Sequence, residues 1–225
     1  MNDRRWRRFG ACLLLAFLAL AIPAHSHTYF SWDPGVAARI QRIPGVYGLM
    51  SAASQFGNGW TPFVVTVVTC LLFLAFRLRG EAAGLGLCVA LGALINRVLK
   101  FLIARQRPEA GIIAVLQQPG GLSFPSGHVA LYVGFFGFLW SVSRARLPPS
   151  SRTRRLLLIL LPIPVALVGV SRVYLGAHWP SDVIGAYLWS SAWLLCCLRI
   201  FRHWLGADAA AGRLPAAPPD SHPRG

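Results

Sequence analysis

The sequence predicts an all-α membrane protein, a polytopic helix bundle with about six transmembrane helices. Of its 225 residues, 55% are hydrophobic and 13% are charged, whereas a soluble domain usually carries about 25% charged residues. The apolar residues form several long runs, and short arginine clusters separate these runs. The formal net charge of +15 therefore indicates membrane topology rather than a nucleic-acid surface, and nucleic acid is not expected as a partner.

The first apolar run follows the basic stretch MNDRRWRRFG and allows two interpretations. It resembles a signal peptide, because Ala24 and Ser26 offer small residues for cleavage. It also fits a first transmembrane helix whose basic end stays in the cytoplasm. The helix is favoured because the rest of the chain is itself membrane-embedded, so residues 1–27 are assigned to an N-terminal transmembrane helix.

The remainder of the chain divides into three regions by composition. Residues 28–60 form an extracytoplasmic connection whose spaced apolar residues predict short amphipathic helices at the membrane surface. Residues 61–205 form the membrane domain, and residues 206–225, rich in Ala, Pro and Gly, are expected to be a disordered cytoplasmic tail. Within the membrane domain the predicted spans are 61–78, 82–103, 128–143, 155–173 and 183–201.

The basic clusters set the orientation of these spans, because loops rich in arginine and lysine face the cytoplasm. One set of alternate connections carries most of the arginines: Arg4, Arg5, Arg7, Arg8, Arg77, Arg79, Arg144, Arg146, Arg152, Arg154, Arg155, Arg199 and Arg202. The opposite, extracytoplasmic side receives Arg39, Arg42, Lys100, Arg105, Arg107 and Arg172. Three of this second group, Lys100, Arg107 and Arg172, are candidate site residues in three short motifs, which are therefore predicted on the extracytoplasmic face.

The first motif, KFLIARQRP, begins at Lys100, at the outer end of the third predicted span. Lys100 is the only lysine of the chain, and Arg107 follows seven residues later, on nearly the same helix face two turns on. Pro108 disfavours helical geometry at Arg107 and would turn that side chain toward a cleft. The alternative is that both cations simply snorkel to the membrane interface.

The second motif, FPSGH, ends at His128, just before the fourth predicted span. Ser126 is a candidate N-cap, and Gly127 lets a ligand approach the backbone closely. Free N–H groups at a helix start bind phosphate oxygens well, and His128 would lie in the first turn. The alternative is a capped helix with an interfacial histidine.

The third motif, SRVYLGAHWPSD, runs from Ser171 to Asp182. Pro180 suits the first turn of a helix, so His178 and Asp182 can face one another near its start. Asp182 could then accept a hydrogen bond from one imidazole nitrogen and leave the other free to act as a nucleophile. Arg172 supplies a fixed cation. The alternative is a helix cap with a surface ion pair.

Whole membrane crossings separate the three motifs, yet all are predicted on one side. Together they offer two histidines, one carboxylate and the three cations Lys100, Arg107 and Arg172. Cations and backbone amides can neutralise a phosphoryl group, while one histidine attacks and the other protonates the leaving oxygen. The seven acidic residues are scattered along the chain, so no carboxylate cluster for a two-metal centre is expected, and neither a metal nor a cofactor is predicted.

The pattern Lys-x6-Arg-Pro, Pro-Ser-Gly-His and Ser-Arg-x5-His-x3-Asp resembles the type-2 phosphatidic acid phosphatase superfamily, which includes lipid phosphate phosphatases and, more distantly, vanadium haloperoxidases. The resemblance covers roughly residues 60 to 200. It implies a six-helix bundle, in a bacterial inner membrane, whose active site faces the periplasm or exterior. It also implies metal-independent hydrolysis through a phosphohistidine on His178, oriented by Asp182, with His128 as general acid. The phosphoryl oxygens would be held by Lys100, Arg107, Ser126, Gly127 and Arg172.

The resemblance further implies a lipid phosphate or diphosphate in the bilayer as substrate. Candidates are undecaprenyl diphosphate, phosphatidic acid, phosphatidylglycerophosphate and lipid A phosphates, and phosphotransfer to another lipid is the alternative reaction. Haloperoxidase chemistry is disfavoured because those relatives are typically soluble and much longer. A non-catalytic phosphate-binding protein would not need a nucleophile, an orienting carboxylate and an acid together. The motif spacing specifies neither the lipid headgroup and tail nor an oligomeric state.

Overall fold

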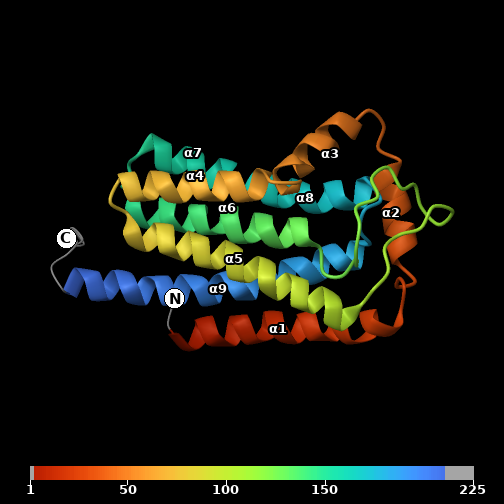
Figure 1. The fold of residues 1–225 in the computed structure, drawn as a ribbon, viewed down its shortest axis with the longest axis horizontal. Coiled ribbons are helices and arrows are strands. Elements are labelled where there is room, and N and C mark those ends of the chain that lie inside the picture. Colours follow the sequence, from red (N-terminus) through yellow and green to blue (C-terminus); the bar gives the residue numbers. More distant parts are fainter. Residues whose placement is uncertain (1–2, 211–225) are drawn as a thin grey trace, which may run out of the picture.

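The computed structural model describes residues 3–210, and every regular element in that range is a helix. Figure 1 shows the long helices lying side by side along one axis, with the short helices α2 and α3 at one end of the bundle. In chain order the elements are α1 (Asp3–Ser26), α2 (Asp33–Gln41), α3 (Tyr47–Ser54), the 3-10 helix η1 (Gln55–Gly57), α4 (Thr61–Ala75), α5 (Arg79–Ile103), α6 (Gly127–Arg146), α7 (Arg152–Leu160), α8 (Pro162–Tyr174) and α9 (Pro180–Ala210).

The helices identify a multi-pass membrane protein. Within the described residues, four segments are long and apolar enough to cross a membrane: Arg4–Ser26, Arg79–Ile103, Arg152–Tyr174 and Pro180–Phe201. A fifth is reached if Tyr47–Gly57 and Thr61–Ala75, which meet at a bend of 59°, count as one span. By length and composition the structure therefore supports four or five spans, fewer than the six predicted.

The central helix α6 is the predicted span that is missing when five are counted. It forms a helix of 20 residues over the predicted span 128–143, but it is not among the segments that meet the length and hydropathy criterion. It packs against α5, α8 and α9, and its glycines, serines and terminal arginines lower its mean hydropathy. Small and polar residues are common where membrane helices contact one another, so a helix enclosed by neighbours need not be as apolar as one facing lipid.

The span predicted at 155–173 is present but irregular. It consists of α7 and α8, which are interrupted at Leu161 just before Pro162. Proline has no N–H to donate, and its ring clashes with the preceding helical turn, so it breaks the hydrogen-bond ladder. The two pieces still qualify together as one span, Arg152–Tyr174.

The two ends of the chain lie against each other in the bundle. α1 packs along α9 and also contacts α5, and Phe17 of α1 stacks on Phe124 with ring centroids 5.8 Å apart. α9 is described as far as Ala210, so the first five residues of the predicted tail are helical, in keeping with the high helix propensity of alanine in this stretch. The rest of that tail, residues 211–225, lies outside the described residues.

The connection between residues 28 and 60 contains the short helices that its sequence predicts, α2, α3 and η1. Proline follows the first residue of α2, a position where its missing N–H costs nothing. Asp33 of α2 and Ser54 of α3 are completely buried, and both helices contact α8. This connection is therefore part of the packed end of the bundle, where the sequence motifs also lie.

Candidate active site

The three motifs meet at the end of the bundle where α5 ends and α6 and α9 begin (Figure 1). Lys100 Nζ donates to the carbonyl oxygens of Leu122 and Ser123 at 2.6 and 2.9 Å. Arg107 Nη1 lies 3.2 Å from His178 Nε2 and donates to Ala177 O at 2.6 Å. Residues separated by whole helices thus lie in one cluster. The prediction that all three motifs are on the same side of the membrane requires such an arrangement.

Lys100 and Arg107 do not share a helix face, which corrects the expectation from their spacing. α5 ends at Ile103 because Ala104 adopts the left-handed conformation, with φ 54°. The chain after Ala104 runs as a loop, and the Arg107 guanidinium donates to Gly120 O and Gly121 O of that same loop. Arg107 lies beyond the end of α5, and the loop that follows Ala104 brings its guanidinium to His178.

His178 and Asp182 face one another at the start of α9, as predicted, but the contact is looser than a direct hydrogen bond. His178 Nδ1 lies 3.5 Å from Asp182 Oδ2, with both side chains buried. Ser123 Oγ lies 3.4 Å from the same Nδ1 and donates a short hydrogen bond to Asp182 Oδ2. The N–H of Trp179 donates to this oxygen at 2.9 Å. Ser123 and Asp182 therefore share the orientation of the imidazole.

The surroundings of His178 favour a neutral ring with its lone pair on Nε2. A guanidinium only donates, so the contact with Arg107 places the lone pair on Nε2 and the proton on Nδ1. Burial lowers the pKa of His178 well below its ordinary value, and the charges of Arg107, Lys100, Arg172 and His128 lower it further. The neutral imidazole, with its lone pair on Nε2, is the form of histidine that can act as a nucleophile.

Arg172 lies at the end of α8 and is almost completely buried. Its Nη1 donates to Ser54 Oγ at 2.9 Å and to Gln117 Oε1 at 3.2 Å. Ser54 Oγ is also 2.9 Å from Ser171 Oγ. The predicted cation is thus fixed by α3 and by the loop before α6, through Ser54 and Gln117, which the motifs do not include.

His128 lies in the first turn of α6, as predicted. Its Nε2 is 2.9 Å from Asn58 Oδ1, so a residue just after η1 orients the second histidine. Gly57 lies against the same ring, because a Cβ at this position would be 2.2 Å from His128 Cδ2. Asn58 and Gly57 belong to the connection between residues 28 and 60 and were not identified from the sequence.

Ser126 occupies the N-cap position of α6, but its side chain makes no capping hydrogen bond, contrary to the expectation. Its backbone is extended, with φ −64° and ψ 120°. Ser126 Oγ is buried and has no hydrogen-bond partner among the described residues. A buried hydroxyl without a partner is unfavourable, and here it lies beside Gly127 at a helix N-terminus, where the first amide N–H groups have no partner within the helix.

Asp182 has a second partner that the sequence reasoning did not single out. Arg105 Nη1 lies 2.7 Å from Asp182 Oδ1, and Arg105 Nη2 lies 3.1 Å from Asp33 Oδ2. All three side chains are fully buried. From the sequence, Arg105 is only one of the predicted extracytoplasmic cations, and no role is predicted for Asp33. The sequence signal for Asp33 is that it is the single acidic residue in the aromatic-rich connection formed by residues 28–60.

The side chains of this cluster are of the types that can bind a phosphoryl group and exchange protons with it. Lys100, Arg107 and Arg172 supply positive charge near His178, and a dianionic phosphoryl group is stabilised by such fixed cations. In the described part of the chain, no group of three or more His, Cys, Asp or Glu side chains has a metal-binding arrangement.

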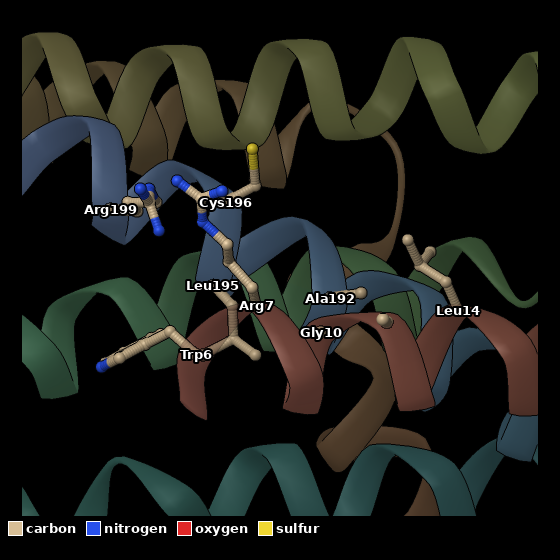
Figure 2. Close-up of a pocket in the computed structure, with 9 residues that line it drawn as sticks. Trp6, Arg7, Gly10, Leu14, Ala192, Leu195, Cys196 and Arg199 are labelled. Carbon is tan, nitrogen blue, oxygen red and sulfur yellow. The ribbon is translucent and has the colours of Figure 1, made fainter. Parts of the chain in front are cut away.

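A separate cavity of about 450 Å³ lies between α1 and α9, far from this cluster. Figure 2 shows its lining, with Arg7 and Trp6 on α1 and Cys196 and Arg199 on α9. Arg199 follows Pro180 by nineteen residues, which is roughly 28 Å along a helix. The cavity therefore belongs to the opposite end of the bundle.

Comparison with known proteins identifies the relatives of the chain. The family model of the PAP2 superfamily matches residues 81–205. Phosphatidylglycerophosphatase B of Bacillus subtilis is 31% identical over 179 residues, covering 78% of this chain and 86% of that protein. Undecaprenyl-diphosphatase of Sulfolobus acidocaldarius is 29% identical over 189 residues, covering 80% and 84%. Decaprenylphosphoryl-5-phosphoribose phosphatase of Mycobacterium tuberculosis is 33% identical over 147 residues, covering 62% and 72%.

Solved structures share the fold. The crystal structure of a transmembrane PAP2 type phosphatidylglycerolphosphate phosphatase from Bacillus subtilis matches with a TM-score of 0.73 and 26% identity, covering 88% of this chain and 96% of that one. Aquifex aeolicus LpxE matches with a TM-score of 0.55 and 22% identity, covering 76% and 96%, which shows a likeness of fold alone. Because the family match spans more than half of the sequence and includes every motif residue, the chain belongs to the PAP2 superfamily.

Proposed function

We propose that this PAP2 superfamily member is an integral-membrane, metal-independent phosphatase of lipid phosphates or diphosphates that works through a phosphohistidine. The observation that carries the proposal is the environment of His178. Its Nδ1 faces Asp182 and Ser123, while its Nε2 faces the Arg107 guanidinium. One nitrogen is thus oriented by a carboxylate, and the other is directed at the cations that would hold a phosphoryl group.

The reaction proceeds in two steps. His178 Nε2 attacks phosphorus and forms an N–P bond, while the P–O bond to the lipid breaks and the leaving oxygen takes a proton from His128. Water then attacks phosphorus and gives a proton back to His128, and the N–P bond breaks to release inorganic phosphate. The carboxylate of Asp182 stabilises the positive charge that the imidazole of His178 acquires in the intermediate.

Lys100, Arg107 and Arg172 would neutralise the phosphoryl oxygens throughout both steps. Ser126 Oγ, which is buried without a partner among the described residues, would donate to one of these oxygens, together with amide N–H groups at the start of α6. Because these donors belong to the protein, the proposed mechanism needs no metal. Loss of activity in chelator that Mg²⁺ restores would contradict it.

The relatives support a lipid substrate. Their names specify phosphatidylglycerophosphate, undecaprenyl diphosphate and a decaprenylphosphoryl sugar phosphate, which share a terminal phosphate or diphosphate linked to a membrane lipid. The candidate site lies at the ends of helices that are long enough to cross a membrane, so a lipid tail can remain in hydrocarbon while its headgroup reaches His178. We therefore include phosphatidic acid and lipid A phosphates among the substrates to be tested.

The central experiment measures phosphate release by the purified protein from a panel of lipid phosphates and diphosphates, with chelator present. We expect at least one lipid to be hydrolysed, and we expect His178→Ala to lower the rate at least about 1,000-fold. Arg39→Gln, which alters an exposed side chain of α2, serves as the matched control. Rapid quenching with phosphorus-labelled lipid should trap acid-labile label on the wild type and none on His178→Ala. An active His178→Ala protein would refute the mechanism.

The proposed location is a bacterial inner membrane, with the site facing the periplasm or exterior and α1 retained as a membrane helix. Cysteine labelling in a cysteine-free background tests the sidedness. Gln118 is exposed in the loop before α6, and Ser150 is exposed between α6 and α7. In intact cells, Gln118→Cys should react with a membrane-impermeant thiol reagent, and Ser150→Cys should react only after lysis. The reverse pattern would place the site in the cytoplasm.

A further inference from the structure

We infer that Asp33 is a positioning residue of the reaction: through Arg105 and Ser181 it holds Asp182 in the place from which Asp182 orients His178. The inference rests on the proposed roles of His178 and Asp182. Asp33 lies outside the region 81–205 that matches the PAP2 superfamily. The connection between α1 and α3 would therefore contribute to the chemistry and not only cover the end of the bundle.

Asp33 has more partners than a residue that only begins a helix would need. It opens α2, and its Oδ2 accepts the N–H of Phe30 at 2.8 Å. Its Oδ1 accepts the N–H of Ser181 at 2.9 Å, and its Oδ2 accepts the hydroxyl of Ser181 at 2.7 Å. Asp33 is therefore fixed directly to the first turn of α9, one residue before Asp182.

Arg105 joins the two carboxylates. Its Nη2 contacts Asp33, while its Nη1 donates both to Asp182 Oδ1 and to Ser181 Oγ at 2.7 Å. Its Nε donates to the carbonyl oxygens of His27 and Thr28 at 3.1 Å. All of its nitrogens thus have partners, so the guanidinium has one defined orientation. Because this orientation depends on Asp33, the loss of that carboxylate would loosen Arg105 and then Asp182.

The charges of this trio also matter. Two buried carboxyl groups share a single guanidinium, so the trio carries a net charge of −1 when both are ionised. That negative charge favours a positively charged ring at His178, and the His178 imidazole acquires positive charge in the proposed intermediate. Neutralising Asp33 would leave Arg105 and Asp182 as a balanced pair and remove this stabilisation. Other charged and titratable groups face His178 from α5, the following loop, α6, α8 and α9: Lys100, Arg107, His128, Arg172 and Asp182.

The geometry separates this role from substrate binding. Asp33 contacts Arg105, Ser181 and Phe30, and none of these residues belongs to the cations proposed to hold the phosphoryl group. Replacing Asp33 should therefore lower kcat and leave KM nearly unchanged. A residue that only supported the fold would lower the amount of active enzyme without changing the pH profile of the active fraction.

The test compares Asp33→Asn, Asp33→Glu and the control Arg39→Gln on one lipid phosphate that the wild type hydrolyses. Active enzyme is counted by the burst of labelled phosphohistidine. For Asp33→Asn we expect kcat per active site to fall about 10- to 100-fold, with KM within about twofold. The acidic limb of the pH profile should move to lower pH, because losing a negative charge makes the imidazole harder to protonate. Asp33→Glu should recover part of kcat, and Arg39→Gln should match the wild type.

Wild-type kcat and pH profile in Asp33→Asn would overturn the inference, as would a loss fully explained by fewer active molecules. If Asp33→Asn does not fold, Ser181→Ala is measured instead. That variant keeps the ion pairs but removes the hydroxyl between them, and we expect a smaller fall in kcat, about 3- to 10-fold, whereas unchanged kcat would overturn the inference. An active His178→Ala protein refutes the proposed function itself, while an inactive one beside a normal Asp33→Asn protein refutes only this inference.

Discussion

Gly57 lies directly against the imidazole ring of His128. A Cβ at residue 57 would be 2.2 Å from His128 Cδ2 and 2.7 Å from Nε2. Carbon atoms do not approach so closely, so glycine is the residue that leaves room for the ring in this position. The 3-10 helix that ends at Gly57 thus packs against the ring of His128, the proposed general acid. This contact leads to a direct prediction for a substitution at Gly57.

Gly57→Ala should displace the His128 ring and impair protonation of the leaving group. General acid catalysis contributes about 100- to 10,000-fold to a rate, so a misaligned acid should lower kcat about 10- to 100-fold, with a small effect on KM. Gly48→Ala is the matched control, because a Cβ at Gly48 in α3 meets no atom within 4 Å. Steady-state kinetics of the two variants decide the matter. Equal kcat values for Gly57→Ala and Gly48→Ala would show that His128 does not need its present position.

Asn58→Ala should affect substrates according to their leaving groups. Asn58 Oδ1 is 2.9 Å from His128 Nε2 and orients the ring. A lipid alcohol is a poor leaving group that needs a proton, whereas p-nitrophenol leaves readily without one. We expect kcat for a lipid phosphomonoester to fall about tenfold more than kcat for a p-nitrophenyl phosphate ester. A uniform loss on both substrates would assign Asn58 to the fold instead of to the acid.

The buried position of His178 predicts an unusual acidic limb in the pH profile. In the proposed mechanism the attacking form is the neutral imidazole, and burial together with nearby cations holds the pKa of His178 well below its ordinary value. The nucleophile should therefore stay unprotonated as the pH falls through about 6.5. In Arg107→Gln one of these cations is lost, so the pKa should rise and the acidic limb should move to higher pH, along with a higher KM.

The measurement is kcat/KM against pH for the wild type and Arg107→Gln on the same lipid. Ionisation of the substrate is identical in the two series, so a difference between the limbs reports on the enzyme. Arg42→Gln, an exposed change at the end of α2, should reproduce the wild-type limb. If the acidic limbs of the wild type and Arg107→Gln coincided, the charge of Arg107 would have no influence on the pKa of His178, and the prediction would be wrong.

The parts of the structure that sequence could predict are those encoded locally. Long apolar runs predict membrane helices, and Ser126 as an N-cap and Pro180 as a first-turn residue predict where α6 and α9 begin. The enclosed helix α6 was predicted as a helix, but its packing against α5, α8 and α9 is a tertiary feature that a linear pattern does not reveal. The break before Pro162, by contrast, could have been predicted from the sequence, because proline interrupts helices.

The partners of the motif residues could not be predicted, because each is one polar side chain brought in from a distant segment. Asn58 contacts a histidine 70 positions away, and Asp33 contacts an arginine 72 positions away. Serine, asparagine and aspartate are common in loops for local reasons, so their composition gives no signal of such contacts. For Ser126 the sequence predicts a contact that is not made. Its position predicts a side-chain hydrogen bond that caps α6, but its hydroxyl makes no such bond.

Glu81 and Arg146 form an ion pair at the opposite end of α5 from Lys100, and this pair should affect stability without affecting catalysis. Glu81 in the first turn of α5 is buried, and it accepts a hydrogen bond from Arg146 at the end of α6, whose side chain is 28% exposed. Glu81→Gln leaves Arg146 without its counter-charge, but solvent reaches the arginine and screens part of the cost. We therefore expect the free energy of unfolding to fall by about 1 to 2 kcal/mol.

A loss of this size should lower the unfolding midpoint in detergent by several degrees, at about 2 to 4 °C per kcal/mol for a chain of this length. The kcat on the preferred lipid should stay at the wild-type value, because Glu81 precedes Lys100 by nineteen residues, roughly 28 Å along the helix. Arg155→Gln removes an exposed charge nearby and should change neither quantity. If Glu81→Gln lowered kcat while the midpoint stayed constant, the two ends of α5 would have to be coupled, and the separation of stability from chemistry drawn from this geometry would be wrong.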